Sequence, residues 1–242
     1  MSEAPPLLAG RSAVVTGASR GIGLATARLF AAEGARVFML ARGAAALRER
    51  AAELGGEALA IPCDVASRDS VQAASTQIVD ALGGAPDVLV NSAGRFHVAP
   101  IAATSPTTFA AMLETNLTAP FLFVHCFLGG MRERGSGHLV SIGSVADRVA
   151  FPENSAYAAS KFGLRALHEV LRAELRGSGV RVTLVSPGPT DTPLWDPINP
   201  DAREGFTPRT AMLDADAVAD AVLYAVTCPP AVNVDELRLT RS

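Results

Sequence analysis

The sequence predicts an α/β fold in which helices cover both faces of one parallel sheet, a doubly wound arrangement. Short apolar runs rich in β-branched residues alternate with longer helical patterns along the chain, as is typical of βαβ units. The predicted strands are almost continuously apolar, which fits strands buried on both faces. A glycine-rich turn at residues 17–23 joins the first strand to the first helix.

The first βαβ unit carries this glycine turn. The run Ser-Ala-Val-Val-Thr at residues 12–16 predicts a strand, and an apolar stripe over residues 24–31 predicts a helix that ends at Glu33-Gly34. A second strand is expected at residues 36–41. Glycines in such a turn let the backbone approach a pyrophosphate, and the free N–H groups at the helix N-terminus bind the anion.

The alternation continues along the chain without a linker or an internal repeat, so we expect a single domain over residues 1–242. Residues 189–212 contain several prolines and no periodic pattern, which is typical of a lid. The remaining strands are expected at residues 58–62, 87–90, 138–142, 180–185 and 236–239, and the remaining helices at residues 44–54, 69–82, 106–132, 156–176 and 214–226.

The composition limits the possible partners. Apolar residues make up 49% of the chain and aromatic residues only 5%, which predicts a core filled by alanine, valine and leucine. A net charge of −3 argues against nucleic acid bound through a basic patch, and Arg132 and Arg134 are interpreted as a solvated helix end. The N-terminus has no export-signal pattern, and no run of about 20 apolar residues follows it. We expect a cytoplasmic protein with no membrane partner.

The three cysteines give no sign of a metal or disulfide site. Cys63, Cys126 and Cys228 are widely spaced and form no CxxC pattern, so neither a disulfide framework nor a zinc site is indicated. We expect no metal, and buried thiols in a reducing compartment.

Tyr157 and Lys161 form a candidate acid/base pair. Residues four apart share one face of a helix, so the Lys161 ammonium is expected to lie near the phenol and lower its pKa from about 10. Such a phenol can exchange a proton near neutral pH. Alone, a tyrosine and a lysine at this spacing are more often a partly buried aromatic and a solvated charge.

Further motifs accompany this pair in a fixed order. They are Thr16-Gly17-Ala-Ser-Arg-Gly21-Ile-Gly23, Asn91-Ser92-Ala93-Gly94, Asn116, Ser144 thirteen residues before Tyr157, and Tyr157-Ala-Ala-Ser-Lys161. Together they resemble the short-chain dehydrogenase/reductase family over nearly the whole chain. One departure is Ser92, where the family more often has a second asparagine, and this affects at most a local hydrogen bond in the loop after the fourth strand.

The resemblance implies a Rossmann-type domain with seven strands, a cofactor half at about residues 8–145 and a catalytic and substrate half at about 146–242. It implies hydride transfer between a nicotinamide and a carbonyl or alcohol carbon. Tyr157 would be the acid/base, Ser144 would hold the substrate oxygen, and Lys161 would lower the tyrosine pKa and bind the nicotinamide ribose. Asn116 would hold a water that links Lys161 to solvent.

The end of the second strand favours NADP(H) over NAD(H). An acid that would bind a ribose 2′-hydroxyl is missing there, and Arg42 offers a planar fork for a 2′-phosphate, with Arg20 as a second charge. Either arginine alone is as consistent with a surface residue. Asp64 resembles an adenine-side contact, or alternatively caps the next helix. The expected cofactor residues are Gly17, Ser19, Arg20, Gly21, Ile22, Gly23, Arg42, Asp64, Val65, Asn91, Ala93, Gly94, Tyr157, Lys161, Pro187, Gly188, Thr190 and Thr192.

The substrate is expected to be a small aldehyde, ketone, 3-oxo or 3-hydroxy compound. This follows from the resemblance of residues 232–242 to an NADP-dependent subgroup of the family. Expected substrate contacts are Ser144, Ala146, Phe151, Tyr157 and Trp195, with Phe206 equally consistent with plain packing and His97 interpreted as a loop histidine.

The resemblance also implies a homodimer or homotetramer formed through the helices at residues 106–132 and 156–176. Two other functions stay open at this point. One is a non-enzymatic dinucleotide-binding sensor, and the other is a lyase, epimerase or dehydratase that uses bound cofactor.

Overall fold

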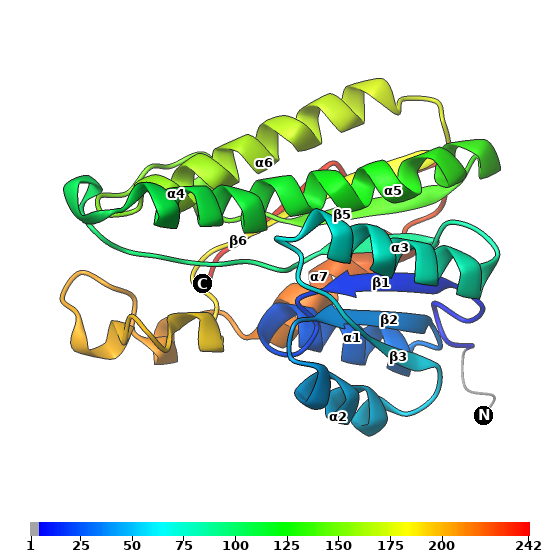
Figure 1. Ribbon diagram of the computed structural model, residues 1–242, viewed down its shortest axis with the longest axis horizontal. Coiled ribbons are helices and arrows are strands. Elements are labelled where there is room, and N and C mark those ends of the chain that lie inside the picture. Colours follow the sequence, from blue (N-terminus) through cyan, green and yellow to red (C-terminus); the bar gives the residue numbers. More distant parts are fainter. Residues whose placement is uncertain (1–4) are drawn as a thin grey trace.

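Seven parallel strands form one sheet in the computed structural model, which describes residues 5–242 (Figure 1). The strand order is β3-β2-β1-β4-β5-β6-β7, with every neighbouring pair parallel. The order in which the chain adds strands reverses between β1 and β4, and ligands bind α/β sheets at such a reversal. The predicted seven-stranded, doubly wound parallel sheet is therefore confirmed. The strands are β1 (Ser12–Thr16), β2 (Arg36–Ala41), β3 (Ala58–Pro62), β4 (Val88–Asn91), β5 (Gly137–Ile142), β6 (Val180–Pro187) and β7 (Glu236–Leu239).

Two buried clusters show which helices cover which face of the sheet (Figure 1). Phe30, Leu47 and Val222 place α1, α2 and α7 on one face, whereas Ile78 and Phe127 place α3 and α5 on the other. Helix α6 joins the second group through Leu171, and α4 packs beside α6. The helices are α1 (Gly21–Ala32), α2 (Ala44–Leu54), α3 (Arg68–Leu82), α4 (Pro106–Leu113), α5 (Ala119–Arg134), α6 (Ser155–Glu174) and α7 (Ala215–Thr227).

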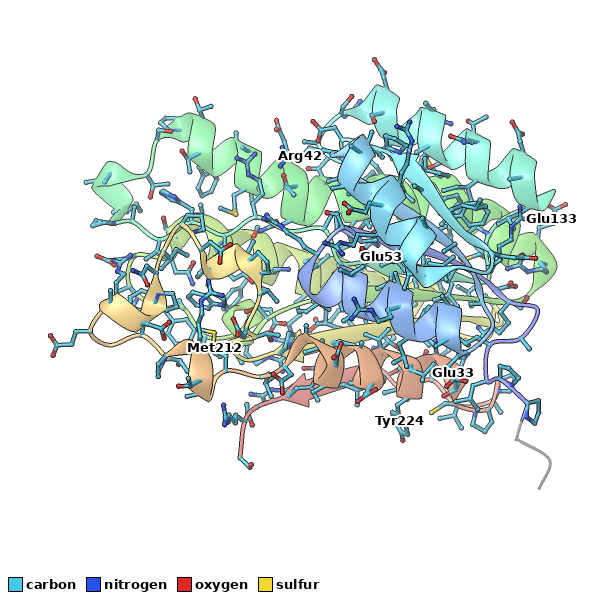
Figure 2. All side chains as sticks on the ribbon, turned by 90° about the horizontal axis from the view of Figure 1, so that it is seen from below. Glu33, Arg42, Glu53, Glu133, Met212 and Tyr224 are labelled. Atoms are coloured by element: carbon cyan, nitrogen blue, oxygen red, sulfur yellow. The ribbon has the colours of Figure 1, made fainter. Side chains whose placement is uncertain are left out.

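The central strands are apolar because they are buried on both sides. Val14 of β1 enters one cluster and Val15 the other, since successive side chains of a strand point to opposite faces. On the outer surfaces, Tyr224 of α7 and Glu133 of α5 point to solvent (Figure 2). The core is largely aliphatic as expected, but its largest fully buried side chains include four phenylalanines, Phe38 in β2 and Phe30, Phe123 and Phe127 in the helices.

The helix predicted at residues 106–132 is interrupted by a π-helical turn at Glu114–Thr118, between α4 and α5. The amide of Ala119 donates to the carbonyl of Glu114, five residues earlier. Pro120 has no N–H to donate to the carbonyl of Asn116, four residues before it, so a regular α-helix cannot continue there. The turn places Asn116 at a local widening, a feature often found at functional sites. The other predicted bounds agree with the structure within three residues.

Among the described residues, the joined segment Pro106–Arg134 is long and apolar enough, by length and composition alone, to cross a membrane. An 18-residue stretch within it has a mean hydropathy of 1.3, a value that core helices also reach. Phe123, Phe127 and Met131 of this segment are fully buried in the cluster under the sheet. We therefore describe it as a core helix. Residues 1–4, on which part of the export-signal expectation rests, lie outside the described residues.

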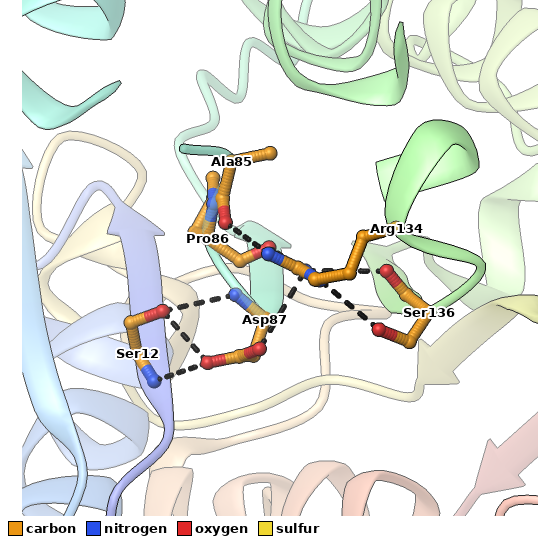
Figure 3. Close-up of polar contacts among 6 residues, drawn as sticks. All are labelled: Ser12, Ala85, Pro86, Asp87, Arg134 and Ser136. Carbon is orange, nitrogen blue, oxygen red and sulfur yellow. Dashed lines mark hydrogen bonds and ion pairs between the residues drawn. The ribbon is translucent and has the colours of Figure 1, made fainter. Parts of the chain in front are cut away.

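Arg134 is exposed, as the sequence indicated for this helix end, but its guanidinium is also held by hydrogen bonds to the protein. Its guanidinium donates to the carbonyls of Ala85 (2.6 Å) and Pro86 (3.0 Å) and to both side-chain and backbone oxygens of Ser136 (Figure 3). It lies 3.5 Å from Asp87, whose carboxylate accepts hydrogen bonds from the backbone and hydroxyl of Ser12, each at 2.8 Å. The end of α5 is thereby joined to the starts of β4 and β1.

We expect Arg134→Ala to lower the free energy of unfolding by about 1–3 kcal/mol, the range for hydrogen bonds made by a charged group. Arg132→Ala is the matched control, because Arg132 is exposed two residues away on the same helix end and should change stability by less than about 0.5 kcal/mol. Urea denaturation of both variants measures the difference. Equal stability of the two variants would contradict a structural role for Arg134.

Candidate active site

A cavity of about 1210 Å³ lies at the carboxyl ends of the strands, beside the reversal between β1 and β4. It exceeds the usual range of about 300–1,000 Å³ for small-ligand pockets, as a site for a dinucleotide and a second ligand requires. Most of the residues predicted from the sequence line it: Gly17, Ser19, Arg20, Gly21, Ile22, Gly23, Arg42, Asp64, Val65, Ala93, Gly94, Ser144, Ala146, Phe151, Tyr157, Lys161, Pro187, Gly188, Thr190, Thr192 and Trp195. Asn91, His97 and Asn116 lie outside this lining.

The glycine turn is packed so tightly that side chains are excluded. A Cβ atom on Gly23 would lie 2.5 Å from the carbonyl oxygen of Gly17, and one on Gly17 would lie 2.8 Å from the Cα of Ala93. Gly17 also has a φ of +70°, which favours glycine. Helix α1 begins here, and no side chain caps its first N–H groups. Such free N–H groups and the narrow cradle fit the pyrophosphate of a dinucleotide.

Thr16 at the end of β1 fixes the loop that follows β4. Its hydroxyl oxygen accepts hydrogen bonds from the backbone amides of Ser92 and Ala93, both at 3.0 Å. The contact uses backbone atoms, so the serine at position 92 does not alter it. Asn91 is buried behind the cavity wall, and within residues 5–242 its side-chain amide has no hydrogen-bond partner.

Exposed charged residues line the cavity in the glycine turn and just after β2 and β3. Arg20 and Arg42 are both exposed and make no ion pair within the described chain. Asp64 does not cap α3, because Ser67 is the N-cap and its hydroxyl accepts the amide of Ser70. Two cations and one acid are thus available in this part of the site.

Tyr157 and Lys161 lie on the first two turns of α6. The ammonium of Lys161 lies 5.6 Å from the centroid of the Tyr157 ring and donates to the carbonyl of Ile142 at 2.7 Å. The side chain of Asn116 accepts from the Arg95 amide at 2.8 Å and donates to Ser160 at 3.0 Å. The π turn is thereby joined to α6 at the residue next to Lys161.

The expected lowering of the Tyr157 pKa is not what the structure shows. Burial raises the pKa of Tyr157 to about 12, against a smaller opposing effect of the Ser144 hydroxyl. Burial also lowers the pKa of Lys161 to about 8. The ammonium of Lys161 donates to the carbonyl of Ile142 rather than to the phenol. Burial therefore sets the direction of the Tyr157 pKa shift. At neutral pH the pair therefore consists of a neutral phenol, which is a proton donor, and an ammonium.

Asp147 is a buried carboxylate at the site that the sequence analysis missed. It ends the short 3₁₀ helix Val145–Asp147 and is fully buried. Its carboxylate accepts from the Ser186 hydroxyl (2.5 Å), the Ser144 amide (3.3 Å) and the Arg148 guanidinium (2.8 Å). Arg148 in turn pairs with Glu236 of β7. The order Ser144-Val-Ala-Asp147 is a capping-box pattern, which could have revealed this contact.

Aromatic rings line the cavity beside Tyr157. Phe96 contacts Tyr157 edge to face, with ring centroids 4.7 Å apart, and contacts Trp195 in the same way at 4.9 Å. Phe206 lies 6.4 Å from Trp195. Phe96 was not predicted, because it follows Gly94 in a loop with no periodic pattern.

The segment at residues 189–212, expected to be a lid, contains three 3₁₀ helices, Pro193–Trp195, Pro200–Ala202 and Arg209–Ala211. Arg209 pairs with Asp191 and Asp196 inside this segment. Thr190 and Thr192 both line the cavity. Thr192 packs on the glycine turn, since a Cβ on Gly21 would lie 3.1 Å from its methyl group.

The fold and the glycine turn at the cavity are those of a dinucleotide-binding α/β protein. Residues 11–203 match the family model for short chain dehydrogenases. D-threitol dehydrogenase of Mycolicibacterium smegmatis is 38% identical over 90% of this chain and 86% of its own. The protein belongs to the short-chain dehydrogenase family of oxidoreductases.

Solved structures agree with this assignment. A metagenomic short-chain oxidoreductase in complex with NADP matches with a TM-score of 0.84 and 34% identity, covering 98% of this chain and 99% of that one. An alcohol dehydrogenase from the archaeon Thermococcus sibiricus, complexed with 5-hydroxy-NADP, matches with a TM-score of 0.83 and 30% identity over 95% of each chain.

The charge of Asp147 raises the pKa of both Tyr157 and Lys161. We therefore expect Asp147→Asn to move the alkaline titration of Tyr157 to lower pH, and to lower the free energy of unfolding by about 1–3 kcal/mol through weaker hydrogen bonds. Tyrosinate absorbance measures the titration. Tyr224 is the other tyrosine of the chain, so subtraction of the Tyr157→Phe titration isolates Tyr157.

Ser186→Ala is the control for that titration, because it removes one hydrogen bond to Asp147 and leaves the charge in place. Its effect on the Tyr157 titration should be smaller. A folded Asp147→Asn protein with an unchanged Tyr157 titration would rule out the electrostatic effect.

Proposed function

We propose that this oxidoreductase transfers hydride between NADP(H) and a carbonyl or secondary alcohol carbon, with Tyr157 as the acid/base. The observation that carries the proposal is the placement of Tyr157 and Lys161 together in the wall of a cavity large enough for a dinucleotide. When bound, the nicotinamide would supply the hydride. The pyrophosphate of the dinucleotide would be held by the uncapped N-terminus of α1 and by the glycine turn of Gly17 and Gly23.

In the reducing direction, Tyr157 would donate its O–H proton to the carbonyl oxygen while the carbonyl carbon gains a hydride. Ser144 would hold the same oxygen. Its own oxygen accepts the Ala146 amide at 3.1 Å, so its O–H is the group that would donate to the substrate oxygen. The Lys161 ammonium would stabilise the phenolate that forms. With a pKa of about 8, Lys161 could pass a proton on near neutral pH, and Asn116 would link this relay to solvent.

The choice of NADP(H) rests on Arg20 and Arg42, which are exposed at the cavity and unpaired within residues 5–242. Two of the matched structures are described as NADP or 5-hydroxy-NADP complexes, which supports the same choice. Guanidinium groups bind phosphate through paired, charge-assisted hydrogen bonds.

The substrate class proposed is a small aldehyde, ketone, 3-oxo or 3-hydroxy compound, or the corresponding alcohol. A relative named for the oxidation of a polyol supports alcohol chemistry. The sensor alternative is disfavoured, since Ser144, Tyr157 and Lys161 all line one cavity. A single domain, a cytoplasmic location and the absence of nucleic-acid or membrane partners remain predictions from the sequence.

Tyr157→Phe tests the acid/base. The substitution removes only the phenolic hydroxyl, so we expect turnover to fall by at least about 100-fold, the lower bound for general acid–base catalysis. NADPH affinity should change little. The measurements are initial rates of NADPH oxidation with a panel of aldehydes, ketones and 3-oxo esters, and NADPH titration by fluorescence. Tyr224→Phe, on the exposed face of α7, should keep full activity; a Tyr157→Phe protein that also does so would refute the assignment.

Arg42→Ala tests the choice of cofactor. Loss of a charge-assisted contact should weaken NADPH binding by about 10- to 100-fold and leave NADH binding nearly unchanged, because only NADPH carries the 2′-phosphate. Arg48→Ala, on the exposed face of α2, is the matched control. Equal losses for the two cofactors, or equal turnover of both by the native protein, would contradict NADP(H) preference.

We also propose a homodimer or homotetramer formed through α4, α5 and α6. Phe109, Phe121, Phe162 and Val170 leave between 38% and 52% of their surface exposed on these helices. Sedimentation at micromolar concentration should give a dimer or tetramer, and Phe121→Glu should shift it towards monomer, because a charge would be buried at the interface. A native protein that sediments as a monomer would exclude this assembly.

A further inference from the structure

Three aromatic rings extend the catalytic end of the cavity away from Tyr157. Phe96, Trp195 and Phe206 line the cavity and are each partly exposed. The ring planes of Phe96 and Tyr157 meet at 71°, those of Phe96 and Trp195 at 72°, and those of Trp195 and Phe206 at 84°. Edge-to-face contacts of this kind are the arrangement that aromatic groups favour. A further planar ring would find matching surfaces next to the phenol.

The polar atom of Trp195 is already used within the protein. Its indole N–H donates to the carbonyl of Thr190 at 3.0 Å, so the indole has no hydrogen bond left to offer a ligand. Phenylalanine has none to offer. A substrate whose hydroxyl groups faced these rings would lose hydrogen bonds to water without replacing them, at a cost in affinity.

The charges at this end are mostly neutralised by protein partners. Glu153 pairs with Arg203 at 3.2 Å, and the Arg203 guanidinium lies 4.7 Å from the centroid of the Phe206 ring. Arg95 also lines the cavity but is exposed, and it makes no ion pair within residues 5–242. The three rings present apolar surface, and of the three charged residues named here only Arg95 has no ion pair within residues 5–242.

We propose that Phe96, Trp195 and Phe206 form an aromatic substrate subsite that selects neutral ketones and secondary alcohols with an aryl group next to the reacting carbon. The inference rests on the proposed function, because Tyr157 defines which carbon reacts. It narrows the substrate class from small carbonyl compounds in general to aryl ketones and aryl alcohols. Polyols and short aliphatic ketones would be poor substrates.

Binding can be measured separately from turnover, because Trp195 is the only tryptophan of the chain. In the presence of NADP⁺, 1-phenylethanol should change the Trp195 fluorescence and bind about 10- to 100-fold more tightly than 2-butanol or threitol, as burial of an aromatic ring predicts. The same preference should persist in Tyr157→Phe, where turnover is lost. Equal affinities for the three alcohols would overturn the subsite.

Kinetics on variants identify the residues responsible. Phe96→Ala and Phe206→Ala should each reduce kcat/KM for acetophenone by about 10-fold or more, and reduce kcat/KM for 2-butanone by no more than a few-fold. Tyr224→Ala removes an exposed aromatic ring far from the cavity and should leave both values unchanged. Equal losses for both ketones would show a merely structural role and overturn the proposal.

A charged ketone tests whether the subsite selects neutral substrates. Acetophenone should be preferred over 4-acetylbenzoate, and the reverse preference would overturn neutrality and point to Arg95 as a carboxylate partner. Failure of the proposed function gives a different result. Tight binding of 1-phenylethanol without turnover of any alcohol or ketone would refute hydride transfer while the subsite stands, whereas turnover of 2-butanone without aryl preference would do the opposite.

Discussion

The architecture of the site depends on the close contact between backbone atoms in the glycine turn that joins β1 to α1. The carbonyl of Gly17 lies where a side chain on Gly23 would have to be, and Gly17 itself lies against Ala93. This approach brings the end of β1, the start of α1 and the loop after β4 into one place. Thr16 then fixes that loop with two hydrogen bonds. The cavity, and the position of Phe96 in the same loop, follow from this packing.

Two kinds of surface meet at Tyr157. On one side is a polar network in which Asp147 joins the Ser144 loop to Ser186 and, through Arg148, to β7. On the other side are rings without hydrogen-bonding atoms to spare. Loss of hydration raises the pKa of Tyr157, which keeps the phenol protonated, and lowers the pKa of Lys161 to about 8. The reacting oxygen would be placed by the polar side and the rest of the substrate by the apolar side.

Periodicity and motif order were enough to predict the strand alternation, the glycine turn and the gathering of Ser144, Tyr157 and Lys161 at one cavity. The pKa of Tyr157 was not predictable, because burial depends on residues distant in sequence. Phe96 and the hydrogen bonds of Arg134 were not predicted for a related reason. A loop aromatic and a helix-end arginine carry no periodic signal, and their partners come from other elements. The π turn was not predicted. Pro120 could have indicated it, because proline cannot donate to the carbonyl of Asn116, four residues earlier.

The contact between Arg148 and Glu236 has a consequence for biosynthesis. The ribosome makes the chain from its N-terminus, and domains assemble as their segments emerge. The loop of Ser144 and Asp147 is synthesised long before β7. The guanidinium of Arg148 therefore lacks the carboxylate of Glu236 until that residue has left the exit tunnel. A nascent chain stalled after Lys161 would hold Ser144, Tyr157 and Lys161 without β7. The contact that ties the Ser144 loop to β7 thus forms late in the synthesis of the chain.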